Sequence, residues 1–207
     1  MAPSRPGESH ASSQGAAAPG EAPRGIAVVV NGNAQSVSEE VIATLDEILE
    51  GGDLYVSRRI EDADAIARTL FDRGYHTILT GGGDGTFTVV VTAVVREAKR
   101  RGVEPPRFGL LRLGTGNSLA WVGGASKTGS GHHGARALPA DIARLRAGAG
   151  SRLLPLVEAE GLLSPFCGFG VDAIVLRDYN ATKKLLARGP LRRLPGIASY
   201  AVAAVTR

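Results

Sequence analysis

The sequence predicts an α/β protein, in which a mostly parallel sheet carries helices on both faces and the beginning of a β-rich second domain follows. Short apolar runs rich in β-branched residues alternate with amphipathic helical patterns from residue 25 onward. Such alternation is typical of parallel sheets covered by helices. Beyond residue 150 the pattern changes to short β-like runs broken by Pro155, Gly161 and Pro165, which favours antiparallel strands.

Composition limits the organisation of the chain and its partners. The chain has 207 residues, 43% of them hydrophobic, which suffices for one full domain and part of a second. Residues 1–24, rich in Ala, Ser, Gly and Pro, are predicted to be a disordered leader, because they lack the apolar core of a secretory signal. We expect an α/β domain over residues 25–150 and the start of the β-rich domain over residues 151–207.

Charge and hydropathy narrow the class of protein further. A net charge of +4 lacks the clustered excess typical of nucleic-acid binding, so no nucleic-acid partner is expected. The sequence contains no uncharged apolar stretch long enough to span a bilayer, so any membrane contact is expected to be peripheral. The predicted localisation is cytoplasmic. The single cysteine, Cys167, excludes an internal disulfide and is expected to be a small buried side chain among apolar neighbours.

The first predicted unit is a strand, a loop and a helix. "GIAVVVNGNA" indicates a buried strand that ends in a turn at Asn31. In "SVSEEVIATLDEILEGG", Ser36 and Glu39 have capping-box spacing, the apolar residues share one helical face, and Gly51 is expected to end the helix.

The pattern then repeats. "DLYVSR" predicts a strand, "EDADAIARTLFDRG" a helix closed by Gly74, and "HTILT" a third strand. A helix is predicted over residues 86–101 despite its valines, because the segment is too long for a strand and ends in basic residues and glycine. "RFGLLRL" predicts the fourth strand, and "LPADIARLRAG" a short helix after a glycine-rich loop.

Three strands are followed by loops of glycine, asparagine and threonine: "VNGNA", "TGGGDGT" and "LGTGN". In a parallel sheet these loops would open at the same edge, where ligands of such sheets bind. Glycine-rich turns before a helix present backbone N–H groups to phosphate. The alternative is that they are tight strand-to-helix turns without a ligand.

Asp84 lies in the middle of the second loop, where a carboxylate would repel phosphate unless it held a metal or accepted a proton. Phosphoryl transfer needs Mg²⁺ to neutralise phosphate oxygens and a group that orients or deprotonates the attacking hydroxyl. Asp84 is therefore predicted to be catalytic. The alternative is that it caps its own helix.

Together, "VNGNA", "GGGDGT", "LGTGNSLA" and "GFGVDAIVL", in this order, resemble the diacylglycerol kinase catalytic domain family, which includes bacterial diacylglycerol kinases and the sphingosine and ceramide kinases. The resemblance covers residues 25–207. It implies an α/β nucleotide domain followed by a β-rich domain, similar in fold to NAD kinases, with the site between the two. It also implies an ATP- and Mg²⁺-dependent kinase that phosphorylates a hydroxyl of diacylglycerol or a sphingoid-type lipid at the membrane surface.

The same resemblance implies roles for individual residues. Asp84 matches the aspartate assigned in sphingosine kinases as the base for the lipid hydroxyl. Asp172 matches an aspartate that faces the lipid head group, although a structural role in a glycine-rich turn stays open. No protein-only metal site is expected. The residues implied to bind the nucleotide are Asn31, Gly82, Gly83, Gly85, Thr86, Gly114, Thr115, Gly116 and Asn117.

Three departures from the family pattern leave alternatives open. The first loop reads "NGNAQS" where the family commonly has Asn-Pro-x-Ser-Gly, and Ser118 stands where an aspartate is usual. No late Asp-Gly-Glu segment precedes Arg207, so the second domain is expected to be incomplete. The alternatives are an NAD kinase-like enzyme, disfavoured because NAD kinases typically show Asn-Glu in place of "LGTGNSLA", and a catalytically incomplete nucleotide- or lipid-binding module.

The basic segment over residues 183–193 also allows two interpretations. It either forms a solvated face or contacts an anionic bilayer surface.

Overall fold

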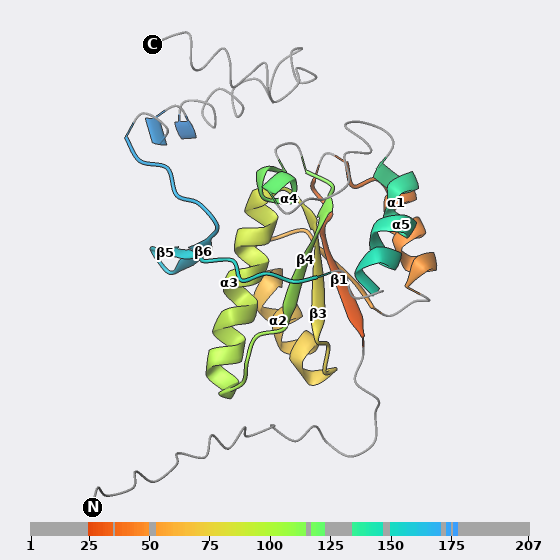
Figure 1. Ribbon diagram of the computed structural model, residues 1–207, viewed down its shortest axis with the longest axis horizontal. Coiled ribbons are helices and arrows are strands. Elements are labelled where there is room, and N and C mark those ends of the chain that lie inside the picture. Colours follow the sequence, from red (N-terminus) through yellow and green to blue (C-terminus); the bar gives the residue numbers. More distant parts are fainter. Residues whose placement is uncertain are drawn as a thin grey trace, which may run out of the picture.

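The structure is a computed structural model, and it describes residues 25–34, 36–49, 53–114, 117–122, 134–146, 150–170, 173–174 and 176–177. Its centre is a four-stranded sheet in the order β2-β1-β3-β4, in which every neighbouring pair is parallel (Figure 1). The strands are β1 (Ile26–Asn31), β2 (Leu54–Ser57), β3 (Thr77–Gly82) and β4 (Arg107–Arg112). The predicted α/β fold is confirmed.

Helices cover both faces of the sheet (Figure 1). They are α1 (Glu39–Ile48), α2 (Asp62–Asp72), α3 (Asp84–Arg101), α4 (Ser118–Val122) and α5 (Gly134–Arg146). Successive residues of β1 point to opposite faces: Val28 and Val30 pack with α1 and α5, whereas Ala27 and Val29 pack with α2 and α3. Both faces of β1 are buried, which explains its unbroken apolar run.

The start of α1 corrects one detail of the prediction. The helix begins at Glu39, and its N-cap is Ser38, whose Oγ accepts a hydrogen bond from Val41 N at 3.3 Å. The predicted capping box of Ser36 and Glu39 is therefore wrong, because the serine nearest the helix supplies the cap. Gly51, predicted to end this helix, lies outside the described residues.

The valine-rich helix is confirmed and is longer than predicted, running from Asp84 to Arg101 as α3. Phe87, Val90, Val91 and Val94 are buried along it. Burial on two sides outweighs the modest cost of β-branched residues in a helix. Gly102 ends the helix with a φ of 68°, a conformation that favours glycine.

The last two helices of the parallel-sheet region differ from expectation. The sequence predicts that the glycine-rich loop extends to Ala137 and that the helix begins at Leu138, but α5 already begins at Gly134 and contains Pro139. The five-residue helix α4 was not predicted, because a segment this short shows no periodic pattern.

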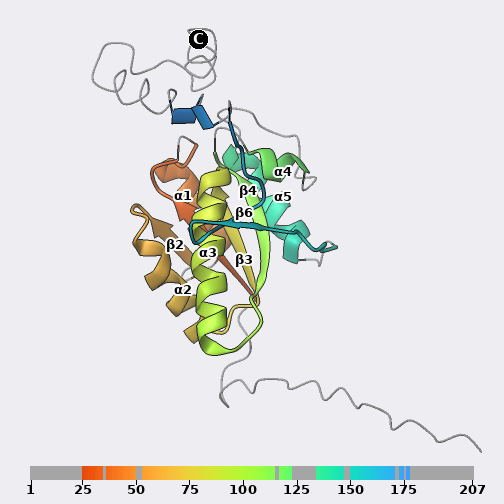
Figure 2. The ribbon, with the colours of Figure 1, turned by 90° about the vertical axis from the view of Figure 1, so that its left-hand side faces the viewer.

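An antiparallel hairpin follows, formed by β5 (Val157–Ala159) and β6 (Leu162–Ser164). Its turn uses Glu160 and Gly161, both at positive φ, so the predicted antiparallel strands with a break at Gly161 are confirmed. The hairpin lies against α3 (Figure 2). Leu163 N donates to Thr92 Oγ1 at 2.8 Å, and Thr88 Oγ1 donates to Ser164 Oγ at 3.4 Å.

Two further predictions concern this part of the chain. Cys167 is exposed, so the expectation of a buried cysteine is wrong: its apolar neighbours, Phe166 and Phe169, are themselves exposed. The division between two domains near residue 150 stays a prediction, and the predicted leader lies outside the described residues.

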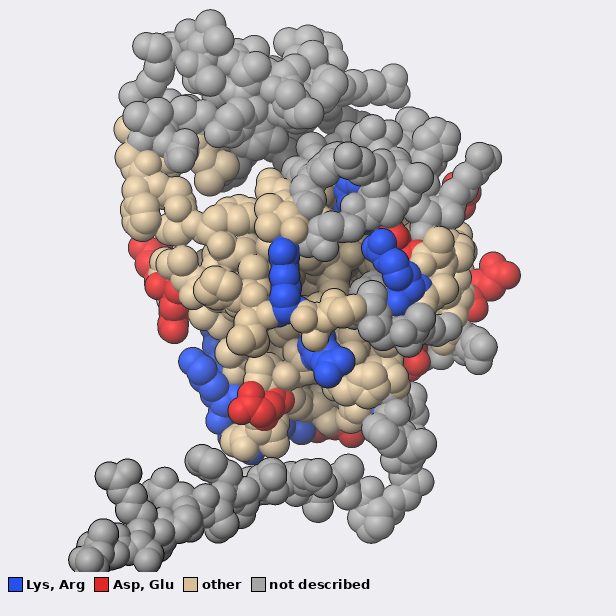
Figure 3. Space-filling model, in the orientation of Figure 1, with Lys and Arg blue, Asp and Glu red and all other residues tan. Residues whose placement is uncertain are grey.

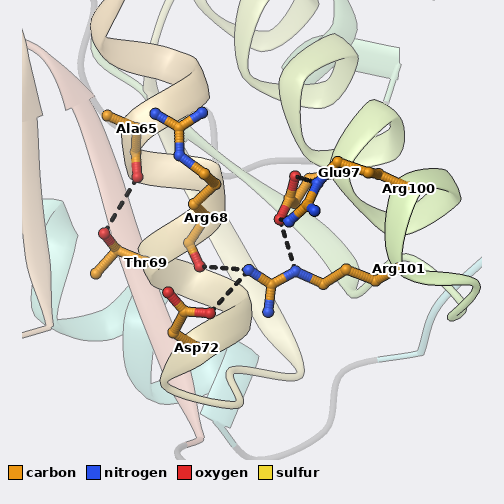
Figure 4. A network of polar contacts seen from close by, with 7 residues as sticks. All are labelled: Ala65, Arg68, Thr69, Asp72, Glu97, Arg100 and Arg101. Atoms are coloured by element: carbon orange, nitrogen blue, oxygen red, sulfur yellow. Dashed lines mark hydrogen bonds and ion pairs between the residues drawn. The ribbon is translucent and has the colours of Figure 1, made fainter.

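A charged network joins the C-terminal ends of α2 and α3 (Figure 4). Glu97 is buried and accepts hydrogen bonds from Arg100 Nε at 2.7 Å and Arg101 Nε at 2.6 Å. Arg101 also reaches Asp72 Oδ1 on α2 at 2.8 Å. The hydrogen bonds from Arg100 and Arg101 lower the pKa of Glu97 to about 2. The network therefore stabilises the C-terminal end of α3, which is the end farthest from Asp84.

Candidate functional site: two glycine loops joined by Asp84

The carboxyl ends of β1 and β3 form the edge where a ligand of this sheet would bind. The two strands are neighbours, with Val30 paired to Gly81, yet the helices that follow them pack on opposite faces. This reversal creates a topological switch point, which is the usual ligand position in open parallel sheets. The loops after Asn31 and Gly82 flank that point.

Asn31, predicted to contact the nucleotide, connects the first loop to the second. Its Nδ2 donates to Thr86 Oγ1 at 3.3 Å, and its Oδ1 accepts from Asn33 N at 2.9 Å. Asn33 Nδ2 in turn donates to the carbonyl of Arg58 at 2.6 Å. The ends of β1, β2 and α3 are therefore held together through side-chain amides.

Three glycines of the second loop have different structural surroundings. A side chain at Gly82 would overlap that of Thr86, which lies in the first turn of α3. Gly83 is the N-cap of α3, and its carbonyl accepts from Thr86 N and Phe87 N. Gly85 is exposed, and a Cβ added there would meet no atom within 4 Å. Packing therefore requires Gly82, whereas Gly85 faces open space.

The third predicted loop meets the second backbone to backbone. A side chain at Gly114 would overlap Gly83 and approach the carbonyl carbon of Gly82 to 2.8 Å. Only a residue without a side chain permits this contact. The structure therefore brings the second and third loops together at one edge, as the sequence predicted.

Asn117 closes the third loop. It has a φ of 53°, its Oδ1 accepts from Gly114 N at 3.1 Å, and its Nδ2 donates to Gly114 O. Both ends of its amide are thus engaged within the loop. Thr115 and Gly116, also predicted to bind the nucleotide, lie outside the described residues.

Asp84 joins the two loops in a way that the sequence did not indicate. Its Oδ2 accepts from Ser118 N and its Oδ1 from Leu119 N, each at 3.0 Å. Through these two bonds Asp84, which is the first residue of α3, caps the N-terminus of a different helix, α4. The alternative that Asp84 caps its own helix is wrong, because Gly83 is the N-cap of α3 and makes no side-chain cap bond.

The carboxylate of Asp84 retains acceptor capacity. Two carboxylate oxygens offer about four lone-pair sites, and the two backbone bonds use two of them. Asp84 is only partly buried, so a proton or a metal ion can still reach it.

Several predicted features lie beyond the described residues, namely Asp172 and the basic segment 183–193. Within the described ranges, no group of three His, Cys, Asp or Glu side chains could hold a metal ion. Among these same residues, no helix is long and apolar enough to cross a membrane.

Comparison with known proteins adds two similarities. Residues 25–144 match a family model described as the diacylglycerol kinase catalytic domain. A stretch of 51 residues is 41% identical to a protein of Enterobacter sp. (strain 638) named "Probable lipid kinase YegS-like". That stretch covers 25% of this chain and 16% of the relative, so the similarity spans about a sixth of the relative's length.

Proposed function

The chain belongs to the diacylglycerol kinase catalytic domain family, and from that premise we propose that it is an ATP- and Mg²⁺-dependent lipid kinase. The proposed reaction transfers the γ-phosphoryl group of ATP to a hydroxyl of diacylglycerol or a sphingoid-type lipid. The observation that carries the proposal is the position of Asp84, whose carboxylate lies at the junction of two glycine loops at the switch point of the sheet.

The loops have the features that a phosphate site requires. The N-terminus of the 18-residue helix α3 presents backbone N–H groups and a partial positive charge. The open space at Gly85 allows a phosphate to approach the backbone there. We therefore propose that the backbone N–H groups of Asp84 and Gly85 and the hydroxyl of Thr86 hold the phosphates, with Gly114 and Asn117 shaping the opposite side.

Mg²⁺ fits the same arrangement. This ion is usually held by one or two carboxylates together with substrate phosphates, and it neutralises charge on the transferring group. Asp84 is the carboxylate at this edge that accepts hydrogen bonds from two loop-adjacent amides. These bonds fix its orientation before a substrate arrives, which is how preorganised groups lower a barrier.

The acceptor hydroxyl would approach Asp84 from the side of the second domain. We propose that Asp84 orients or deprotonates this hydroxyl, that Asp172 contacts the lipid head group, and that the basic segment 183–193 contacts an anionic bilayer peripherally. On the face drawn in Figure 3, several basic side chains lie over the middle and at the lower left, and acidic ones lie at both sides and low near the centre.

The direct test measures transfer of the γ-phosphate from labelled ATP to one acceptor at a time: diacylglycerol, sphingosine or NAD. The two lipid acceptors are presented in mixed vesicles, and NAD is added in solution. We expect a Mg²⁺-dependent product with one of the two lipids and none with NAD. Gly114→Val is the negative control, because its side chain would collide with the Gly83 backbone and separate the third loop from the second. Transfer to NAD, or no ATP binding by calorimetry, would contradict the proposal.

A further inference from the structure

We infer that Arg152 is a positioning residue for the third loop, residues 113–117, and acts by holding the C-terminal end of α4. The inference rests on the proposed function, because it assigns a role in nucleotide binding. It concerns a residue outside the family-matched range, which ends at residue 144.

Helix α4 cannot set its own position. It has five residues, no acid in its first turn and no base in its last, and helices this short are not stable by themselves in water. Its apolar residues Leu119 and Ala120 are buried, and Leu119 packs with Phe87 and Val91 of α3. This contact holds one side of α4 and leaves its two ends to be fixed by other groups.

Both ends of α4 are held by charged side chains from distant parts of the chain. At the N-terminal end, Asp84 accepts from Ser118 N and Leu119 N. At the C-terminal end, Arg152 Nη2 donates to Val122 O at 2.5 Å. The anion lies at the positive end of the helix dipole and the cation at its negative end, so both charges stabilise the same placement.

The placement of α4 determines that of the loop before it. Asn117 directly precedes Ser118 and is bonded to Gly114, which in turn touches Gly83. Gly114 and Asn117 therefore have little freedom to shift unless α4 shifts with them. Arg152 is exposed and bonds the end of α4 opposite to Asn117, so it acts on Asn117 through the helix.

Arg152 is itself anchored to α3. It belongs to the segment that leads into the hairpin β5–β6, and this hairpin is bonded to the middle of α3 through Leu163 and Thr92. Leu156, between Arg152 and β5, packs into the same apolar cluster as Phe87. Helix α3 thus reaches α4 by two routes, directly through Asp84 and indirectly through the hairpin and Arg152.

The chain carries its own reporter for this inference. Trp121 is the single tryptophan of the protein and lies in α4, so intrinsic tryptophan fluorescence comes from this helix alone. The experiment uses the full chain with Arg152→Gln, Arg152→Lys and the control Arg144→Gln. Arg144 is a half-exposed arginine of α5 that pairs with Asp141 three residues earlier, so its replacement makes the same charge change away from α4.

Two quantities are measured for each variant: the Kd for Mg²⁺–ATP by calorimetry, and the emission and acrylamide quenching of Trp121. We expect Arg152→Gln to raise the Kd roughly three- to tenfold, as loss of one charge-assisted hydrogen bond implies, and to change the Trp121 signal. Arg152→Lys should restore much of both, since an ammonium group also donates to a carbonyl. Arg144→Gln should behave like the wild type.

The outcomes separate this inference from the proposed function. A wild-type chain that binds no Mg²⁺–ATP would overturn the proposed function and the nucleotide part of the inference, while the Trp121 signal would still report whether Arg152 holds α4. Binding and fluorescence unchanged in Arg152→Gln would overturn the inference and leave the proposed function standing. Equal impairment by Gln and Lys would also overturn it.

Discussion

The two ends of α3 each carry a carboxylate, and their surroundings differ. Glu97, in the penultimate turn, is clamped by the guanidinium groups of Arg100 and Arg101. In the part of the chain that the structure describes, Asp84, at the first residue, is bonded by backbone amides alone. A carboxylate paired with two cations has its charge neutralised within the fold, whereas one held by neutral amides keeps its negative charge for a metal or a proton. The comparison supports a structural role for Glu97 and is consistent with the catalytic role proposed for Asp84.

The largest expected effect is at Asp84. Asp84→Asn should reduce phosphoryl transfer by about a hundredfold or more, the usual range for loss of general-base assistance. Thermal stability should fall only modestly, because the single amide oxygen of asparagine still accepts one of the two cap bonds to α4. Rates with the best lipid acceptor and melting curves of the same preparation provide the measurement. Near-normal turnover would show that Asp84 serves only as the cap of α4.

The next effect concerns two glycines, Gly114 and Gly85, one from each of the loops that Asp84 joins. Gly114→Ala should lower the free energy of unfolding by about 1–3 kcal/mol, because the added methyl group collides with the Gly83 backbone. Gly85→Ala, the control, should be neutral or stabilising by up to about 1 kcal/mol, since alanine favours a helix and meets no atom there. Gly85→Ala should nevertheless weaken Mg²⁺–ATP binding. Denaturant unfolding and calorimetry, performed on both variants, separate packing from ligand approach.

At the C-terminal end of α3, we expect Glu97 to make the stability of the protein depend on pH. The pKa of Glu97 in the folded state, about 2, lies below its ordinary value of 4.5. The stability that this residue contributes is therefore fully present above about pH 4.5 and is lost as the pH falls toward 2. Unfolding followed at a series of pH values should show a smaller acid-induced loss for Glu97→Gln than for the wild type.

The same variant also tests the comparison between the two ends. At neutral pH, Glu97→Gln should leave the affinity for Mg²⁺–ATP unchanged, because Glu97 is separated from the site by most of the 18-residue helix. A large loss of binding in a folded protein would contradict the assignment of a purely structural role.

The smallest expected effect is in the middle of α3. Thr92→Val removes the acceptor for Leu163 N and should destabilise the docked hairpin by about 0.5–1.5 kcal/mol. Faster hydrogen exchange of the Leu163 amide is the specific readout. Thr44→Val is the matched control, since the Thr44 hydroxyl donates to the carbonyl of Glu40 one turn earlier in the same helix. Equal exchange of Leu163 in the two variants would show that the hairpin is held by its apolar contacts alone.

The sequence predicted the elements whose residues repeat with a clear period. The strands and the helices α1 to α3 follow from apolar patterns. The valines of α3 favour a strand, but the length and the basic end of the segment indicated a helix. Helix α4 was missed since its position depends on Asp84, which lies 34 residues before Ser118. The role of Arg152 was missed for the same reason: its partner, Val122, is 30 residues away.

The residues of the glycine loops show a similar limit. Their composition predicted that the loops meet at one edge, because parallel strands place their carboxyl ends together. It did not show that the amide of Asn117 would be engaged by Gly114, or that Gly83 and Gly114 would touch. Local patterns do not encode contacts between two loops, which depend on the twist and register of the sheet between them.

The docking of the hairpin on α3 has a consequence for the order in which the protein folds. The bonds that complete the loop region join residues 30 to 71 positions apart, whereas those that build α1, α2 and α3 join near neighbours. Closing long loops costs more chain entropy, and such contacts tend to form after local ones. During refolding, Trp121 fluorescence should therefore reach its native value no earlier than the circular dichroism of the helices. Nucleotide affinity would then be gained at the end of folding, so that a partly folded chain would bind no ATP.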